Sequence, residues 1–395
     1  MTGPSVKEDI RAGWPIYLIA INMRAPIIMI GPLLPILKSD FDLSTLSQSV
    51  LTSISVVAFS LMALVMHRVN RLGSTNQVLT LSAIFLFLGL FFRTVSGVFG
   101  LFLFSLVIGI SIAILNFMLP VWVKENASKG SGYITGIYAA IMGTCGSLAV
   151  AAAVPLAEIS NLSWRISMIP AIAVAFIVAL IWFFKFRDPH FKAATPIESQ
   201  SILRNPLFKS PAAWAVALYF GCQSMMFYST ATWIPTILLT KGFSLSQAGV
   251  ALAVATFIGS IVGIFVPHFA SMRADARPLL AAISLLNIGS FAAVALDSGP
   301  RVIIWLILGN IGLFISFPIS LLLCVTRSSS ADGTKYLSIM SQSVGYLLAA
   351  VAPLIMGVIF DITLDWSMAL AFIVFLACVQ LISGLFAGKP GEIKI

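Results

Sequence analysis

Arg24 is the residue of this chain whose type and position most clearly point to chemistry. It stands about ten residues into the apolar segment 14–37 and is the only charged residue there. On a membrane helix this is roughly 15 Å from the interface at about 1.5 Å per residue, too deep for the side chain to reach water. A charge at the bilayer centre costs about 2.5–3.5 kcal/mol on insertion scales, so we expect Arg24 to face a cavity or a partner.

The sequence offers no carboxylate as that partner, because all 14 Asp and Glu residues fall in tails, loops or the ends of apolar segments. Two interpretations stay open. Either a substrate anion neutralises Arg24, or Arg24 is structural and is held by helix-end carbonyls and water. The same segment contains Pro26, Pro32 and Pro35, which interrupt a helix as at transporter binding sites or only bend it for packing.

Polar side chains in other apolar segments could add hydrogen bonds to such a site. Ser338, Gln342 and Tyr346 are spaced four residues apart, so they share one face of a helix. Buried amides and phenols are as often interhelical hydrogen bonds as ligands, and both roles stay open. The candidates for substrate contact beside Arg24 are Asn116, Tyr138, Gln223, Tyr228, Asn310, Gln342 and Tyr346.

The residue constellations of enzymes are missing from the sequence. None of the three histidines, His67, His190 and His268, stands near a mid-segment acid or cysteine. There is no glycine-rich phosphate loop, which argues against ATP-driven transport. We therefore expect a protein that is not an enzyme and holds no cofactor or metal. If protons are coupled, the substrate or a tyrosine or histidine network must carry them.

The composition requires that these residues be positioned by membrane helices. Of the 395 residues 59% are hydrophobic and 9% charged, against about 25% charged in soluble domains. A β-barrel would alternate polar and apolar residues, whereas these runs are continuous. The sequence predicts an all-α membrane protein with twelve transmembrane helices, at about 14–37, 47–67, 75–95, 98–123, 132–156, 163–186, 211–239, 245–268, 277–297, 301–325, 334–360 and 366–388.

The twelve segments form two sets of six, separated by the longest break. Phe41-Asp42-Leu43-Ser44 after the first segment resembles Phe243-Ser244-Leu245-Ser246 after the seventh, at an offset of 202, which indicates two pseudo-symmetric six-helix bundles. The expected organisation is an N-terminal tail (1–13), a first bundle (14–186), a linker (187–210), a second bundle (211–388) and a C-terminal tail (389–395).

The basic residues predict the orientation. With the termini inside, 17 of the 23 Lys and Arg residues fall on the inner side and five on the outer side, Arg24 being the remaining one. We therefore expect both termini and the linker in the cytoplasm and the chain in the inner (plasma) membrane. The charges are scattered, so we expect no nucleic-acid partner, only lipid and a small-molecule substrate, and a monomer. The five outer residues are Lys38, Arg93, Arg165, Lys241 and Arg301.

Two homologous sets of six helices resemble the major facilitator superfamily. Asn22-Met23-Arg24 followed by Gly31-Pro32-Leu33-Leu34-Pro35 looks like the first span of the cyanate porter family, which includes cyanate and 2-nitroimidazole transporters. Trp233-Ile234-Pro235 resembles its seventh span, and the run from Gln342 to Ala350 its nitroimidazole branch. The resemblance adds Asn22 and Trp233 to the candidate substrate-binding residues.

The sequence thus predicts a secondary transporter that moves a small anionic or weakly acidic organic solute by alternating access. Such a solute would be cyanate-like, or a small carboxylate or heterocycle. An alternative is an exporter of a neutral heteroaromatic compound such as a nitroimidazole-type drug, recognised by aromatic residues such as Trp233. A non-transporting membrane sensor is a third class, although a sensor usually carries an additional signalling domain.

Overall fold

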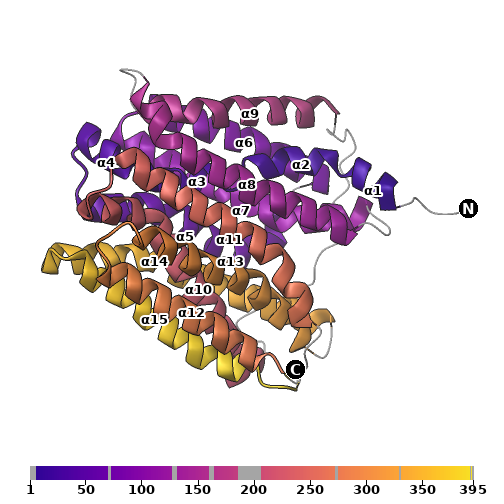
Figure 1. The fold of residues 1–395 in the computed structure, drawn as a ribbon. Coiled ribbons are helices and arrows are strands. Elements are labelled where there is room, and N and C mark those ends of the chain that lie inside the picture. Colours follow the sequence, from indigo (N-terminus) through magenta and orange to yellow (C-terminus); the bar gives the residue numbers. More distant parts are fainter. Residues whose placement is uncertain are drawn as a thin grey trace, which may run out of the picture.

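The computed structural model describes residues 6–69, 73–126, 131–159, 164–185, 206–271, 275–328, 331–391 and 393. The described residues form an all-helical bundle (Figure 1). The predicted linker 187–210 lies outside the described residues except for its last five residues, which include a short 3-10 helix, η2 (Pro206–Lys209).

Two sets of helices make up the bundle, as the sequence predicts. The N-terminal set comprises α1 (Val6–Ala12), α2 (Trp14–Ile21), α3 (Ala25–Ile28), α4 (Ile30–Phe41), α5 (Thr45–Val69), α6 (Thr75–Val95), α7 (Val98–Asn126), α8 (Ser131–Glu158) and α9 (Trp164–Lys185). The C-terminal set comprises α10 (Pro211–Thr240), α11 (Leu245–Ser271), α12 (Arg277–Leu296), α13 (Val302–Thr326), α14 (Ala331–Thr363) and α15 (Trp366–Ala387).

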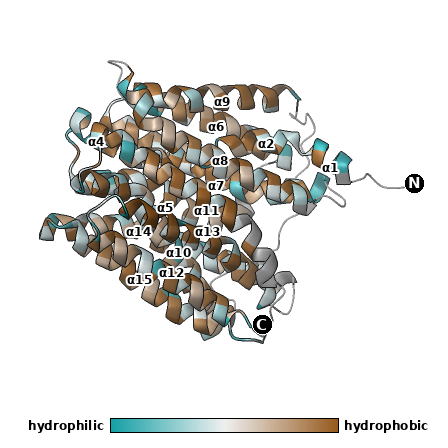
Figure 2. Cartoon of the chain, viewed as in Figure 1, coloured by the Kyte–Doolittle hydropathy of each residue, from teal (hydrophilic) through white to brown (hydrophobic). Residues whose placement is uncertain are grey.

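Within the described ranges, ten straight helices are long and apolar enough to cross a membrane, and the bent run α2–α4 makes an eleventh. α10, with 30 residues, is as long as these helices but is not among those apolar enough to cross a membrane, and most of its side chains are buried. Hydrophobic residues cover the outer helices while hydrophilic ones gather at the helix ends (Figure 2).

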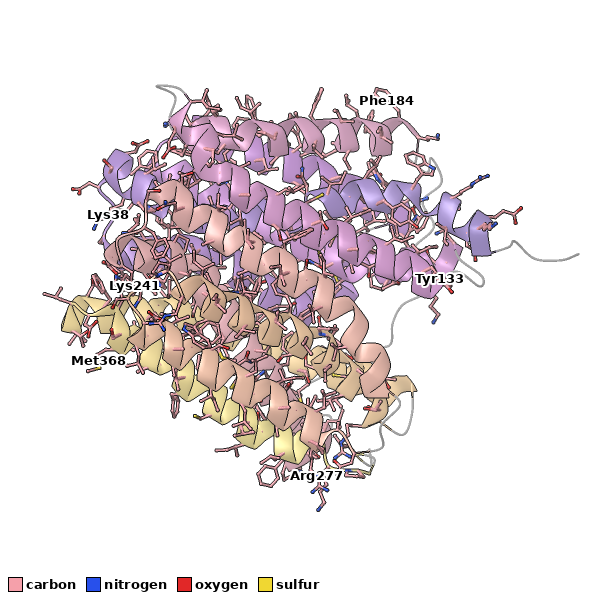
Figure 3. The ribbon with its side chains drawn as sticks, in the orientation of Figure 1. Lys38, Tyr133, Phe184, Lys241, Arg277 and Met368 are labelled. Carbon is pink, nitrogen blue, oxygen red and sulfur yellow. The ribbon has the colours of Figure 1, made fainter. Side chains whose placement is uncertain are left out.

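The bundle has two ends, which we name by what they carry. The terminal end carries α1 and the end of α15 (Figure 1), and Tyr133 and Arg277 lie there (Figure 3). The distal end carries the turn from α4 to α5, and Lys38 and Lys241 lie there (Figure 3).

The two halves meet along their inner helices, where α5 packs on α14, α8 on α11, and α4 on α10. At mid-depth the Ser60 hydroxyl donates a 2.8 Å hydrogen bond to the Ser343 carbonyl. In the distal half the two backbones approach closely at Gly31, where a Cβ would collide with the Ala231 carbonyl oxygen. Glycine is therefore required there for the halves to approach this closely.

The internal repeat is present, but at an offset of 200 rather than 202. Asp42 and Gly242 both have positive φ, at 50° and 89°. The next residue in each half donates its N–H five residues back, to Lys38 and Leu238 respectively, as in a Schellman motif. The hydroxyls of Ser44 and Ser244 then accept backbone N–H bonds at the start of α5 and α11. The alignment of Phe41–Ser44 with Phe243–Ser246 is therefore shifted by two residues, because the two halves share the turn that ends the helix and not the residue types.

The predicted C-terminal tail is partly packed against the second bundle. Ile393 is 6% exposed within an apolar cluster that includes Leu207 of η2. Its N–H donates to the Arg327 carbonyl at the end of α13, and the Arg327 guanidinium donates to Gly391.

Candidate functional site

The first span is broken next to Arg24. Helix α2 ends at Ile21 and α3 begins at Ala25, and a bend of 47° follows at Met29. Pro26 lacks the N–H that would continue the helix, and it is tolerated because it lies in the first turn of α3. Pro32 and Pro35 are accommodated inside α4, so the first span is interrupted beside Arg24 and bent at Met29, and is not broken at all three prolines.

The Arg24 side chain crosses from the N-terminal half to two phenyl rings of the C-terminal half. Its guanidinium carbon lies 4.8 Å from the ring centre of Phe227 on α10 and 5.3 Å from that of Phe314 on α13. The two rings are nearly perpendicular, at 83°, with their centres 5.6 Å apart. On the other side, a Cβ at Gly146 of α8 would lie 3.3 Å from the Arg24 Cβ. The arginine therefore lies at a corner formed by two ring faces.

Arg24 has no hydrogen-bond or ion-pair partner among the residues that the structure describes. The ion pairs found within those ranges are Arg277–Asp275 and Arg301–Asp297. Arg24 is part-exposed, and its nitrogens are not among the buried unpartnered atoms. A desolvated cation–π contact is worth about 2 kcal/mol, so two rings offset much of the roughly 2.5–3.5 kcal/mol cost of a mid-membrane charge. The N–H groups of the Arg24 guanidinium remain free to bind an acceptor.

Three of the predicted candidates lie on helices close to this arginine. The phenols of Tyr228 and Tyr346 are both within electrostatic range of Arg24. The Tyr346 ring packs against Phe59 of the other half, with ring centres 5.2 Å apart. Gln342, one turn earlier on α14, is part-exposed, and its side-chain amide makes no hydrogen bond within the described ranges. The structure thus places Tyr228 and Tyr346 within electrostatic range of Arg24, with Gln342 on the same helix as Tyr346.

Four other candidates use their side chains in helix contacts. Asn22 donates a 2.7 Å bond to the Ala171 carbonyl, joining the first span to α9. Gln223 donates to the Leu313 carbonyl at 3.1 Å and also accepts from Ser224. The remaining two also donate to carbonyls, Trp233 to Pro353 and Asn310 to Leu306. All four are at most 3% exposed, and a role in substrate binding stays a prediction for each.

Asn116 and Tyr138 are part-exposed residues on α7 and α8 of the N-terminal half. Asn116 donates its amide N–H to the Ile112 carbonyl one turn back, which leaves its amide oxygen free of any hydrogen bond found in the described ranges. Tyr138 packs against the apolar cluster of the first bundle. Their part-exposure is compatible with solute contact, which stays a prediction.

Arg93 is a second interior arginine, and its position near the end of an apolar segment predicted only that it lies on the outer side, not that it is buried. It stands in the last turn of α6 and is 1% exposed. Its guanidinium donates a 3.0 Å bond to the Pro26 carbonyl and lies 3.3 Å from the Met168 sulfur. Phe227 and Phe314 were also missed, because in sequence they are ordinary apolar-segment residues.

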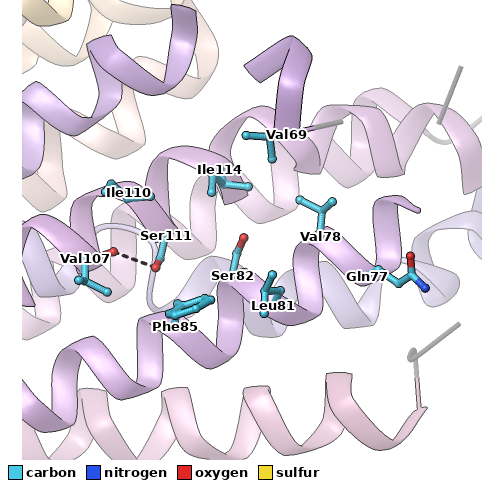
Figure 4. A pocket seen from close by; sticks show the side chains of 10 residues that line it. All are labelled: Val69, Gln77, Val78, Leu81, Ser82, Phe85, Val107, Ile110, Ser111 and Ile114. Atoms are coloured by element: carbon cyan, nitrogen blue, oxygen red, sulfur yellow. Dashed lines mark hydrogen bonds between the residues drawn. The ribbon is translucent and has the colours of Figure 1, made fainter. Parts of the chain in front are cut away.

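A groove of about 470 Å³ lies away from Arg24, between the terminal-end part of α5 and helices α6 and α7 (Figure 4). Its wall is apolar and contains no charged side chain, and Leu81 and Phe85 are about half exposed. The Ser111 hydroxyl in the wall is already bonded to the Val107 carbonyl (Figure 4). The groove faces the lipid side and does not suit an ionic solute.

In the described part of the chain, long apolar helices form two sets that meet around an interior arginine, an arrangement typical of membrane transporters, and the comparison with known families agrees. The sequence model of the Major Facilitator Superfamily matches residues 16–353. The chain belongs to this superfamily. Similar folds include a D-xylose-proton symporter, with a TM-score of 0.76, 11% identity and coverage of 96% of this chain and 97% of that one.

Among individual proteins, the chain is 30% identical to a 2-nitroimidazole transporter of Escherichia coli, over 96% of this chain and 95% of that protein. It is 24% identical to the cyanate transport protein CynX of Escherichia coli, over 90% and 92%. An uncharacterized transporter of Bacillus subtilis, YycB, is 29% identical over 95% and 92%. The resemblance to the cyanate porter family is therefore confirmed.

Proposed function

We propose that this transporter carries a small anionic or weakly acidic organic solute, with Arg24 as the anchoring cation. The observation that carries the proposal is that Arg24 lies between the halves with its donors unpaired in the described part of the chain. A planar guanidinium can bind two acceptor atoms of one anion at once, which strengthens and orients the contact. Neutral hydrogen bonds would be added by the hydroxyls of Tyr228 and Tyr346 and by the amide of Gln342, one turn before Tyr346 on α14.

Transport would proceed by alternating access, with the solute held where the halves meet. The closed contact at Gly31 and Ala231 supports a state in which the distal end is shut. We propose that the terminal end faces the cytoplasm, because most basic residues flank that end. An impermeant maleimide added to intact cells should then label a cysteine at Asp361 and spare one at Arg277, both exposed positions. The transporter is proposed to act as a monomer.

Uptake into proteoliposomes tests the role of Arg24. Labelled cyanate and labelled 2-nitroimidazole serve as probes, because relatives are named for these solutes. We expect Arg24→Gln to reduce uptake at least 100-fold. Arg24→Lys should keep part of the uptake, because the positive charge remains but the planar guanidinium that binds two acceptor atoms is lost. Arg165→Gln is the matched control, since Arg165 also lies over a ring, Trp164, but at the start of α9. Full uptake by Arg24→Gln would disprove the proposal.

Carriage of a neutral heteroaromatic solute is the second candidate. The rings of Phe227, Phe314, Tyr228 and Tyr346 around Arg24 favour it, because flat heterocycles stack on aromatic faces. Trp233 is less suited to this role, since its ring packs on Trp366 at 4.9 Å and is 1% exposed. This candidate predicts uptake that persists in Arg24→Gln and is lost in Phe227→Leu.

A further inference from the structure

The guanidinium of Arg24 lies against two aromatic rings of the opposite half. This contact is relevant to the conformational change that the transporter makes when no solute is bound. Arg24 belongs to the first span, whereas Phe227 and Phe314 belong to α10 and α13. Both rings are buried, at 6% and 9% exposure. The contact therefore joins the halves at the depth of the proposed site.

A transporter that catalyses net movement must return empty after each delivery. With solute bound, the anion neutralises Arg24 during the loaded step. In the empty step that anion is gone, and no ion pair with Arg24 is found in the described ranges. An uncompensated charge at mid-membrane would make the return slow.

We propose that the Phe227 and Phe314 rings are the counter-group of Arg24 when no solute is bound, and that they thereby permit the empty return. This inference rests on the proposed function for its role in transport. The rings present their negative faces to the cation, and aromatic rings accept a cation without competing permanently with a solute anion, as a carboxylate would. The pair therefore takes the place of an acidic residue in this interior.

The contact can be tested without any solute by a double-mutant cycle on thermal unfolding. Phe227→Leu/Phe314→Leu keeps the apolar character and removes the rings. We expect it to lower the melting temperature of the solute-free protein by several degrees in the presence of Arg24, and by clearly less in an Arg24→Gln background. Equal losses in both backgrounds would show that the rings only pack, and would overturn the inference whether or not a substrate is known.

The transport role is tested by comparing exchange with net uptake of labelled cyanate in proteoliposomes, because cyanate is an anion whose binding we assign to Arg24 and not to the rings. Exchange, with unlabelled solute inside, needs no empty return, whereas net uptake does. We expect the double leucine variant to keep exchange within about twofold and to lose net uptake at least tenfold. Phe317→Leu is the control, one turn further along α13 and packed on Phe220, and should leave both rates unchanged.

The outcomes separate this inference from the proposed function. Equal loss of exchange and net uptake in the double variant, or no loss of either, would overturn the empty-return role. If wild-type protein does not carry cyanate, this test of the proposed function fails, and the unfolding cycle still decides whether the rings are the counter-group of Arg24.

Discussion

Arg24 lies in the bent first span, and Arg93 of α6 donates to Pro26, two residues further along the same span. Both arginines are in the interior, yet their surroundings differ. Arg93 is fully buried, and its two terminal nitrogens donate to the Pro26 carbonyl and the Met168 sulfur, while its Nε has no partner among the described residues. Arg24 is part-exposed, and its guanidinium lies against two ring faces with no acceptor among the described residues. The difference teaches that a charge at depth does not by itself indicate a ligand site. What matters is whether the protein supplies the acceptors.

Loss of Arg93 should produce the largest effect on the fold. Arg93→Ala leaves the buried Pro26 carbonyl without this donor, which costs about 1–3 kcal/mol, and it also opens a cavity beside α3. We expect a lower melting temperature in detergent and low yield of folded protein. Arg165→Ala, which removes a part-exposed arginine, is the control. An Arg93→Ala protein that folds normally but does not transport would reverse the roles we give the two arginines.

Gly31 lies just after the bend at Met29 and allows the first span to approach the other half. The closed state of the distal end therefore depends on this glycine. Gly31→Ala should keep the distal end from closing, because the added Cβ meets the Ala231 carbonyl. We expect uptake to fall about tenfold with little loss of folded protein. A cysteine at Val154, buried beside Gly249, should become reactive to an impermeant maleimide in a background without native cysteines.

Gly289→Ala is the matched control for that substitution, because a Cβ there meets nothing within 4 Å. Normal uptake and an unreactive Val154→Cys in the Gly31→Ala protein would show that distal closure does not depend on this contact.

A comparison of two glutamines extends the contrast to neutral groups. Gln342→Ala should weaken solute affinity about tenfold, the value of one hydrogen bond of about 1.4 kcal/mol, with an unchanged melting temperature. Tyr346→Phe should act in the same direction. Gln223→Ala should instead lower the melting temperature, because Gln223 bonds the Leu313 carbonyl. Affinity and thermal unfolding are measured on all three proteins, and a Gln342→Ala variant that fails to fold would assign Gln342 to packing.

The smallest effect is expected at Asp297, in the loop after α12. A hydrogen bond from the Gly299 N–H, with further contributions from Trp305, Arg301 and Lys241, holds the pKa of Asp297 below its usual value. Its stabilising contribution is therefore present above the unfolded pKa of about 4 and is lost as the pH falls through the folded pKa.

Asp297→Asn should accordingly melt slightly below wild type at pH 7 and together with it in strong acid. Melting curves between pH 2 and pH 7 on both proteins measure this, with Asp361→Asn as the exposed control. A constant difference at every pH would mean that the carboxylate charge is not what contributes.

Much of the fold could be predicted from the sequence, because long apolar runs in a membrane have few alternatives to helices. The depth of Arg24 and the absence of a mid-segment acid were also readable from residue spacing. Arg93 was counted among the outer basic residues because it stands near the end of an apolar run, and only the packing of α6 against the bend reveals its burial. Phe227 and Phe314 could not be identified, since their pairing with Arg24 depends on the contact between halves.

The repeat shows a similar limit. Side-chain letters suggested an offset of 202, whereas backbone conformation sets it at 200, with Asp42 and Gly242 as equivalent left-handed residues. The polar candidates divide into those that bond another helix and those that do not, and the sequence could not predict this division. A sequence shows that an amide is present but not whether a carbonyl of another helix is within reach, as it is for Asn22 and Gln223.

The central claim is that Arg24 binds the negative group of the solute, and solute binding to the purified protein tests it most directly. Thermal unfolding is measured with cyanate, acetate and benzoate, and with the neutral amides acetamide and benzamide, on wild type and Arg24→Gln, because a ligand stabilises the state it binds. We predict saturable stabilisation of wild type by at least one anion, weak or no stabilisation by its amide, and loss of the anion effect in Arg24→Gln. No stabilisation by any anion, equal stabilisation by an anion and its amide, or an undiminished anion effect in Arg24→Gln would contradict the claim.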